Sequence, residues 1–325
     1  MDNENINWGI IGCGAVTEVK SGPAYQKVDG FKLQAVMRRT LALAEDYAQR
    51  HEVPQFSHDA DELINDPNID AIYVATPPDS HKHYALKVAA AGKPCCIEKP
   101  LAPNLADSQA IVDAFASTNT PLFVAYYRRS LPRFNKIKEI MDAGTLGSLR
   151  HVQWHLSSPA SAKELAGEYD WHTDPMIARA GHFDDLACHG LDLFAYLFGD
   201  FSEVHGVVKN QQDLYRAADA VSACWSHSNG MTGTGSWNFG AFARHDEVCL
   251  YGSQGELRFS IFAEKPMILL TADGETQFNI EHPENIQLYH VQNMRDALLH
   301  GTAHPSTGDS AHHTSWVMEE ILNSH

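Results

Sequence analysis

The first 126 residues alternate between short apolar runs rich in β-branched and aromatic residues and longer segments with helical periodicity. The runs expected to form strands span 6–12, 31–37, 69–76, 93–97 and 121–126, and the helical patterns between them span 41–51, 80–92 and 105–117. Strands joined through helices of this length pair in parallel and place helices on both faces of the sheet. This alternation constrains the fold more than any other feature and predicts an α/β domain.

The pattern changes after about residue 126. Helices are expected near 132–143 and 182–198, then hairpin-like strands with glycine turns from 201 to 280, and finally two helices. This mixture predicts an α+β domain with an open, mainly antiparallel sheet. Because 325 residues with 44% hydrophobic content can fill two cores, we expect domains at 1–125 and 126–325.

Charge and composition exclude several classes of partner. The formal net charge of −17 argues against nucleic acid and anionic membranes, although a phosphate site needs only local positive potential. The N-terminus lacks the basic region of a signal peptide, and no apolar window approaches the thickness of a bilayer. The six cysteines show no CxxC spacing and lie mostly in apolar segments, which predicts reduced, buried thiols in a cytoplasmic protein.

A glycine motif, Gly12-x-Gly14-x-x-Thr17, ends the first expected strand. Gly12 permits a tight turn, and Gly14 lets the backbone approach a pyrophosphate at the N-terminus of the following helix. The third glycine of the dinucleotide fingerprint is replaced by Thr17, which should loosen the packing of helix on strand. The strand before the motif and the helix after it favour a dinucleotide site over a glycine turn that binds nothing. The residues expected to line this turn are Gly12, Cys13, Gly14, Ala15 and Val16.

The end of the second expected strand bears on the choice of cofactor. An NAD site usually places an acidic residue there for the ribose 2′-hydroxyl, but this chain has Arg38, Arg39 and Thr40. Arginine forks match the geometry of a 2′-phosphate, so NADP is favoured over NAD. The alternative is that Arg38 and Arg39 stack on the adenine or point to water.

The stretch "CCIEKP" (95–100) sets Glu98 and Lys99 where an apolar run stops. In isolation this pair is typical of a solvated surface turn. In an open parallel sheet, however, ligands bind beyond the carboxyl ends of the strands. Lys99 is therefore expected near the nicotinamide.

At this point the chain resembles the Gfo/Idh/MocA oxidoreductases, the family of glucose-fructose oxidoreductase and inositol dehydrogenase. The segments that carry the resemblance are "GIIGCGAV" (9–16), 74–102 with its EKP signature, 124–134 and 180–199. The resemblance covers nearly the whole chain and implies a Rossmann cofactor domain followed by a substrate domain. It also implies that Thr76, Pro77, His81, Glu98 and Lys99 line the cofactor site.

The segment 182–198 predicts an amphipathic helix with His182, Asp185 and His189 on its polar side. Its apolar stripe comprises Phe183, Leu186, Ala187, Leu191, Phe194 and Phe198. Taken alone, the polar side is typical of a solvated face. A zinc site is disfavoured because the spacing is not HExxH and no cysteine pair accompanies it, so no metal is expected.

The family resemblance changes the interpretation of this helix, because it implies that a D-x-x-x-H pair faces the nicotinamide. Asp185 and His189 fall on that pair and, with Lys99, would form the catalytic set. His189 would accept the proton of a substrate hydroxyl, and Asp185 would orient the imidazole or share the substrate hydroxyls. Lys99 would polarise the oxygen, with exchange of the proton by Lys99 itself as an open alternative.

The substrate pocket is expected around Trp171 and His172, in a loop before this helix that covers the substrate in family members. Many relatives have arginine where His172 stands. Tyr127 and Arg128 are further candidates, with a packed aromatic and a surface cation as the alternative. A stacking indole with several hydrogen-bonding groups suits a cyclic polyol or a sugar.

The leading interpretation is an NAD(P)-dependent dehydrogenase or reductase acting on a sugar or polyol. Two alternatives remain open: a redox-neutral NAD-dependent glycoside hydrolase and a non-catalytic dinucleotide-binding regulator. A homodimer or homotetramer is also expected, because the strands at 222–239 carry aromatic and apolar side chains on a face that an open sheet would bury by assembly.

Overall fold

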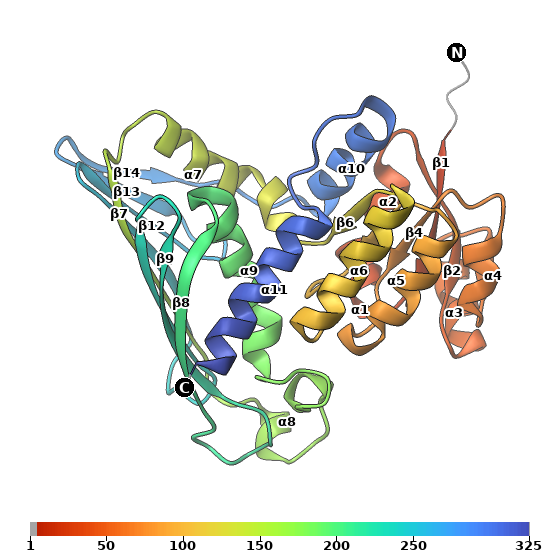
Figure 1. Cartoon of the computed structure of the whole chain (residues 1–325), viewed down its shortest axis with the longest axis horizontal. Coiled ribbons are helices and arrows are strands. Elements are labelled where there is room, and N and C mark those ends of the chain that lie inside the picture. The colour runs from red at the N-terminus through yellow and green to blue at the C-terminus, as the bar shows by residue number, and fades with distance from the viewer. Residues whose placement is uncertain (1–4, 325) are drawn as a thin grey trace. The chain divides into compact units, whose positions relative to one another are not determined.

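The computed structural model describes residues 5–324, which form two compact units (Figure 1). The first unit comprises the described residues up to Leu131 together with His282–His312. The second comprises Pro132–Glu281 and the described residues from His313 onward. This division differs from the expected domains at 1–125 and 126–325, because the segment 282–312 returns to the first unit. Among residues 5–324, no helix is long and apolar enough to cross a membrane.

The first unit contains a six-stranded sheet with the order β3-β2-β1-β4-β5-β6. Its strands are β1 (Ile6–Ile11), β2 (Phe31–Met37), β3 (Gln55–Ser57), β4 (Ala71–Val74), β5 (Cys95–Ile97) and β6 (Leu122–Val124). All of its strand pairs are parallel. The predicted Rossmann domain is confirmed, and β3 is the strand that the sequence did not predict.

Seven helices are described for the first unit. They are α1 (Ala15–Val19), α2 (Gly22–Lys27), α3 (Leu41–Arg50), α4 (Ala60–Asn65), α5 (His81–Ala90), α6 (Leu105–Thr118) and α10 (Leu288–His300). The helix α6 shows why the local sequence folds this way: the Asn104 side chain accepts a bond from the Asp107 amide at 2.8 Å, and Asn119 ends the helix at φ 52°. The aromatic rings of Trp8, Tyr25 and Tyr73 are fully buried in the hydrophobic core of this unit.

The second unit contains an eight-stranded sheet with the order β14-β13-β12-β11-β7-β10-β9-β8. Its strands are β7 (Leu149–Ser157), β8 (Phe201–Lys209), β9 (Ala220–His227), β10 (Thr232–Asn238), β11 (His245–Gly252), β12 (Gly255–Phe259), β13 (Met267–Thr271) and β14 (Gly274–Phe278). Only the β7–β10 pair is parallel. The predicted open, mainly antiparallel sheet is confirmed, although β7, near its middle, was not predicted.

Helices pack on one face of this sheet. They are α7 (Pro132–Asp142), α9 (His182–Phe198) and α11 (Gly308–Asn323), and α8 (Ala162–Leu165) lies in the loop before α9 (Figure 1). Gly190 of α9 must be glycine, because a Cβ there would lie 2.3 Å from the Trp154 ring. Trp154 and Trp237 meet edge to face at 5.4 Å, so the aromatic core of the unit lies between α9 and the sheet.

The direction of the side chains at 222–239 corrects the premise of the assembly prediction. Trp225 and Trp237 are buried on the helix-covered face, 4% and 0% exposed. The side chains that alternate with them, on the opposite face, are small and polar: Ser222, Cys224, Thr232, Thr234 and Ser236. The cysteine prediction also holds only in part, since four of the six thiols are buried but Cys224 is exposed and Cys249 is half-buried.

Candidate active site

The turn after β1 has the geometry that a pyrophosphate needs. Gly12 has φ +94°, and a Cβ there would lie 2.7 Å from Thr76 Cγ2 and 3.0 Å from the Ala75 backbone. A Cβ on Gly14 would meet nothing closer than the Gly12 carbonyl oxygen at 3.8 Å. Gly12 is therefore required for the turn itself, and Gly14 leaves open the space at the start of α1 where a phosphate would bind.

Thr17, which replaces the third glycine, does not leave an unsatisfied polar group. Its side chain is fully buried, and its hydroxyl donates to the Gly14 carbonyl at 2.8 Å. Its own carbonyl accepts a bond from the Tyr47 hydroxyl of α3 at 2.8 Å. The expected loosening is therefore offset by one hydrogen bond within the turn and one that ties the turn to α3.

Arg38 lies next to the glycine turn. Its Nη1 atom donates to the Cys13 carbonyl oxygen at 3.5 Å, and the side chain is half-buried. Burial raises the pKa of the Cys13 thiol to about 11, and the charge of Arg38 opposes that rise. Arg39 and Thr40 are exposed just beyond it. The structure thus brings the guanidinium of Arg38, the residue after β2, to the turn that would hold a dinucleotide.

His81 connects the ends of β4 and β5. Its side chain is fully buried, with Nε2 at 2.8 Å from the Thr76 carbonyl oxygen and Nδ1 at 3.0 Å from the Pro100 carbonyl oxygen. Burial lowers the pKa of His81, although these carbonyl partners oppose the shift. Pro77, by contrast, is exposed at the start of the short turn that leads into α5.

Glu98 is buried at the end of β5, with 7% of its surface exposed. Its Oε1 accepts bonds from the Tyr73 hydroxyl at 2.5 Å and from Gln287 Nε2 at 2.8 Å, and its Oε2 accepts from the Lys99 amide at 3.2 Å. Lys99 itself is half-buried. The surface-turn interpretation of "EKP" therefore fails for Glu98, which is held in place by groups from β4 and from the segment before α10.

In the second unit, α9 (His182–Phe198) spans the predicted residues. Gly181, the residue before the helix, has a φ of +62°. Asp185 and His189, four residues apart, share one side of this helix. His189 is 5% exposed and its ring meets Phe262 edge to face at 5.8 Å. A fully solvated polar face is therefore ruled out for His189. His182, seven residues before His189, has its Nε2 3.0 Å from a carboxylate oxygen of Glu164.

Trp171 and His172 form a stacked pair in the short helical turn before α9. Their ring centroids lie 3.6 Å apart, and the Asp170 carboxylate lies 2.6 Å from His172 Nδ1. Burial alone would raise the pKa of Asp170, but the bonds from the His172 backbone and ring lower it overall. Both rings are half-buried, so this loop offers an indole face stacked on an imidazole that the Asp170 carboxylate contacts.

Tyr127 and Arg128 belong to the first unit and follow β6. They are 6% and 4% exposed, and the guanidinium carbon of Arg128 lies 5.0 Å from the centroid of the Tyr127 ring. The alternative that Arg128 is a surface cation is therefore wrong.

Residues 6–126 match the family model described as "Oxidoreductase family, NAD-binding Rossmann fold", and residues 134–258 match the one described as "GFO/IDH/MocA C-terminal domain". Oxidoreductase P35 of Formosa agariphila is 34% identical over 317 residues, 97% of this chain and 97% of that protein. The chain belongs to the Gfo/Idh/MocA family. It is an NAD(P)-dependent oxidoreductase.

The chain is also similar to two proteins described as levoglucosan dehydrogenase. Levoglucosan dehydrogenase of Pseudarthrobacter phenanthrenivorans is 30% identical over 213 residues, 63% of this chain and 54% of that protein. A solved levoglucosan dehydrogenase in complex with NADH and levoglucosan has a TM-score of 0.86 and 21% identity, and the match covers 98% of this chain and 97% of that one. At this identity the likeness shows a shared fold.

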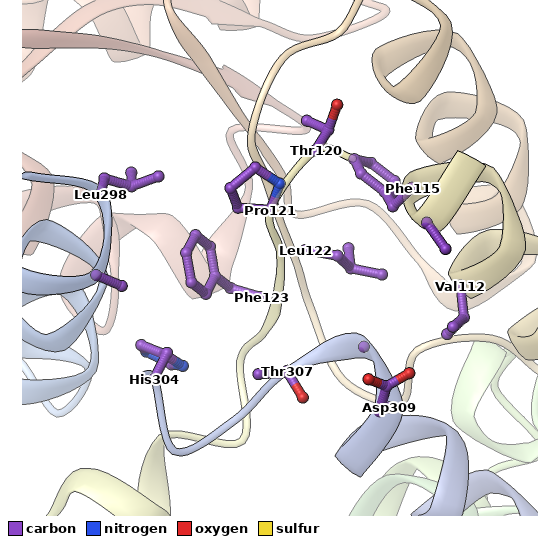
Figure 2. A pocket seen from close by; sticks show the side chains of 13 residues that line it. Val112, Phe115, Thr120, Pro121, Leu122, Phe123, Leu298, His304, Thr307 and Asp309 are labelled. Atoms are coloured by element: carbon purple, nitrogen blue, oxygen red, sulfur yellow. The ribbon is translucent and has the colours of Figure 1, made fainter. Parts of the chain in front are cut away.

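A cavity of about 310 Å³ lies in the first unit. Its walls come from α6, β6, α10 and the segment 304–309, and Figure 2 shows Phe123 and His304 facing it. The two rings lie 4.8 Å apart. None of the predicted cofactor or catalytic residues lines this cavity.

Within residues 5–324, no cluster of three or more His, Cys, Asp or Glu side chains is placed to hold a metal ion. Sequence reasoning missed Gln287, which contacts Glu98 from the distant segment before α10. It also missed Asp184, which neighbours the predicted catalytic Asp185. A single glutamine and a second aspartate in a polar helix turn carry no motif that would have revealed them.

Asp184 provides a test of the buried start of α9. Burial raises the pKa of this carboxyl to about 6, and a bond from the Ala180 amide at 2.8 Å opposes the shift. A pKa raised above that of the unfolded chain, ~3.9, means that the folded state loses stability as pH rises through this interval. The difference in unfolding free energy between Asp184→Asn and wild type should therefore shift in favour of Asp184→Asn by about 1–3 kcal/mol as the pH rises from about 4 to about 8.

Urea unfolding at several pH values measures this difference. Asp273→Asn, a substitution at an exposed turn, is the matched control and should show no such trend. A constant difference between Asp184→Asn and wild type across this pH range would contradict the raised pKa.

Proposed function

We propose that the protein is a dehydrogenase that transfers hydride between NADP(H) and a CH–OH carbon of a sugar or polyol. The observation that carries the proposal is the Glu98–Lys99 turn at the carboxyl end of β5, in the same unit as the open glycine turn at Gly12 and Gly14. The relatives named for levoglucosan, a sugar derivative, support this substrate class. The stacked Trp171–His172 pair supports it independently, because aromatic faces pack well on sugar rings.

The proposed chemistry divides the work among three side chains. A bound nicotinamide supplies the hydride acceptor at its C4. His189 takes the hydroxyl proton as the carbon–hydrogen bond breaks, so that the alcohol becomes a carbonyl while one hydride and one proton leave it. Asp185 orients the imidazole or a substrate hydroxyl, and the Lys99 ammonium stabilises negative charge developing on the oxygen.

The cofactor and substrate contacts follow the same scheme. Gly12, Cys13, Gly14, Ala15 and Val16 hold the pyrophosphate, with Arg38 and Arg39 on the 2′-phosphate. Thr76 and Pro77 line the cofactor site, and His81, fully buried, supports it by joining the Thr76 and Pro100 backbones. Trp171, His172, Tyr127 and Arg128 contact the substrate.

The first experiment measures binding of NADPH and NADH by fluorescence and then screens aldoses, ketoses, inositols and anhydrosugars for turnover. Oxidation or reduction of at least one of them supports the proposal. Cleavage of a glycoside without net change in the nicotinamide would support the redox-neutral hydrolase instead. Tight dinucleotide binding together with no reaction on any compound would favour a regulator.

We also propose a homodimer or homotetramer joined through the uncovered face of the eight-stranded sheet. That face is polar rather than apolar, and its side chains are tied together: His151 lies 2.9 Å from Thr232 Oγ1 and 3.1 Å from Thr234 Oγ1. Short side chains ordered in this way form a flat surface that a second copy can cover.

Light scattering should therefore show a dimer or tetramer at micromolar concentration. Thr234→Arg, which places a long cation in the middle of the face, should shift the protein toward the monomer by at least about tenfold in dissociation constant. Thr276→Arg, on the edge strand β14, is the control. A monomeric wild-type protein would remove this proposal.

A further inference from the structure

Gln287 joins two parts of the first unit that lie far apart in the sequence. It is fully buried at the residue before α10. Its backbone amide donates to the Lys20 carbonyl at the end of α1, at 3.1 Å, and its side-chain Nε2 donates to Glu98 Oε1 at 2.8 Å. The helix that follows the glycine turn is thereby connected to the carboxylate that precedes Lys99.

The Glu98 carboxylate is oriented by these contacts. The Tyr73 hydroxyl and Gln287 Nε2 both donate to Oε1, which leaves Oε2 to accept the Lys99 amide at 3.2 Å. Hydrogen bonds to an ionised acceptor are stronger than those between neutral groups. Losing either donor to Oε1 would free the carboxylate to rotate and would weaken its hold on the Lys99 backbone.

The amide of Gln287 has one possible orientation, because a carboxylate only accepts hydrogen bonds and Nε2 must face it. Its Oε1 is buried and has no hydrogen-bond partner among the described residues. A buried acceptor without a donor is unfavourable, and an apolar side chain of similar size would fill the space without that cost. The contribution of Gln287 is therefore its bond to Glu98 rather than its packing.

The other titratable groups around Glu98 are neutral near pH 7. Burial raises the pKa values of Tyr25, Tyr73 and Cys96, and the negative charge of Glu98 raises them further. Burial lowers the pKa of His81. Lys99 is the next residue in the chain. A second acid placed at 287 would therefore titrate as a pair with Glu98.

We propose that Gln287 is a positioning residue for the reaction: together with Tyr73 it holds the Glu98 carboxylate, and through it the Lys99 backbone, at the end of β5. The inference rests on the catalytic role of Lys99 given under the proposed function. Gln287 lies in the segment 282–312, which belongs to the first unit. In this proposal the segment helps to position a catalytic residue in addition to completing the fold of that unit.

The direct test needs neither substrate nor cofactor. Hydrogen exchange of the Lys99 amide is measured in wild type, Gln287→Met, Tyr73→Phe and Asn285→Leu. Asn285 is the matched control, because its side chain donates to the Val19 carbonyl at 2.7 Å and makes no bond to Glu98. We expect about tenfold faster exchange of the Lys99 amide in Gln287→Met and Tyr73→Phe, the effect of losing one hydrogen bond, and no change in Asn285→Leu.

The Glu98 amide, bonded to the Val74 carbonyl at 2.9 Å, reports whether the sheet itself survives. Its exchange should stay at the wild-type rate in all four proteins. Unchanged exchange of the Lys99 amide in Gln287→Met, or equal acceleration in Asn285→Leu, would overturn the proposal.

Kinetics supply the second readout once a substrate is found. Gln287→Met should lower kcat by about 10–100-fold, the range for a small misplacement of a catalytic group, with the cofactor affinity unchanged. Gln287→Glu should add a step to the pH profile of kcat, because two carboxyls this close share a proton at low pH and repel when both ionise. The activity of Gln287→Glu should fall as pH rises through that step. Wild type lacks this particular step because residue 287 then carries no titratable group.

Lys99→Ala, assayed beside these variants, separates the two possible failures. Normal turnover in Lys99→Ala would remove the proposed catalytic role and this inference with it. Loss of turnover in Lys99→Ala together with wild-type kcat and pH profile in both Gln287 variants would remove only this inference.

Discussion

Lys99→Ala and His189→Ala should each lower turnover by about 10²–10⁴-fold, the range for losing a group that stabilises developing charge, as proposed for Lys99, or a positioned proton-transfer group, as proposed for His189. Lys99 follows a carboxylate held by Tyr73 and Gln287, and His189 is held in the side of α9 that it shares with Asp185. Steady-state kinetics and cofactor binding on each variant measure the effect.

Lys93→Ala is the matched control for Lys99→Ala. Lys93 lies before the opposite end of β5 and donates to the Asp66 carbonyl at 2.7 Å, so its loss should leave turnover unchanged. Asp185→Asn should cost less than either catalytic substitution or act mainly on substrate affinity, because its proposed role is orientation. Near-normal turnover in Lys99→Ala or His189→Ala would show that the chemistry lies elsewhere.

Arg38→Asp should weaken NADPH binding by about 1.5–3 kcal/mol, the scale of a charge-assisted hydrogen bond, and weaken NADH binding far less. The guanidinium lies beside the glycine turn, 3.5 Å from the Cys13 carbonyl oxygen, where the ribose of a bound dinucleotide would pass. Fluorescence titration with both cofactors measures the difference.

Arg50→Ala controls for the loss of a nearby positive charge. Arg50 is paired with Glu18 and Asp46 at 2.8 Å each, so its removal should affect NADPH and NADH alike. If the native protein binds NADH more tightly than NADPH, the assignment of Arg38 and Arg39 to a 2′-phosphate is wrong.

Much of the fold could be predicted because its signals are local. The helix at 182–198 was predicted to its ends, since a glycine precedes it, another follows it, and its apolar stripe has the helical period. The strand β3 escaped because it has three residues, two of them exposed. The strand β7 was missed although its buried residues alternate with polar ones such as Gln153 and His155, which is the period of a strand with one covered face.

The candidate site was predictable where motifs mark it and not where tertiary contacts make it. Gly12, Gly14 and Lys99 each stand at a strand end that the alternation of strands and helices locates. Gln287 reaches Glu98 across 189 residues of sequence, and no local pattern indicates such a pairing. The return of 282–312 to the first unit escaped for the same reason: a helix pattern shows that α10 forms but not which core buries it.

The proposed roles of Lys99 and His189 in a hydride transfer between a nicotinamide and a sugar or polyol can be tested with an isotope label. The most direct measurement supplies NADP⁺ and a polyol deuterated at its CH–OH carbons, and follows the label by mass spectrometry into the reduced nicotinamide. We expect wild type to transfer deuterium to the nicotinamide, and Lys99→Ala and His189→Ala to do so about 10²–10⁴-fold more slowly. Reduced cofactor without deuterium, or equal transfer by the two variants, would contradict these roles.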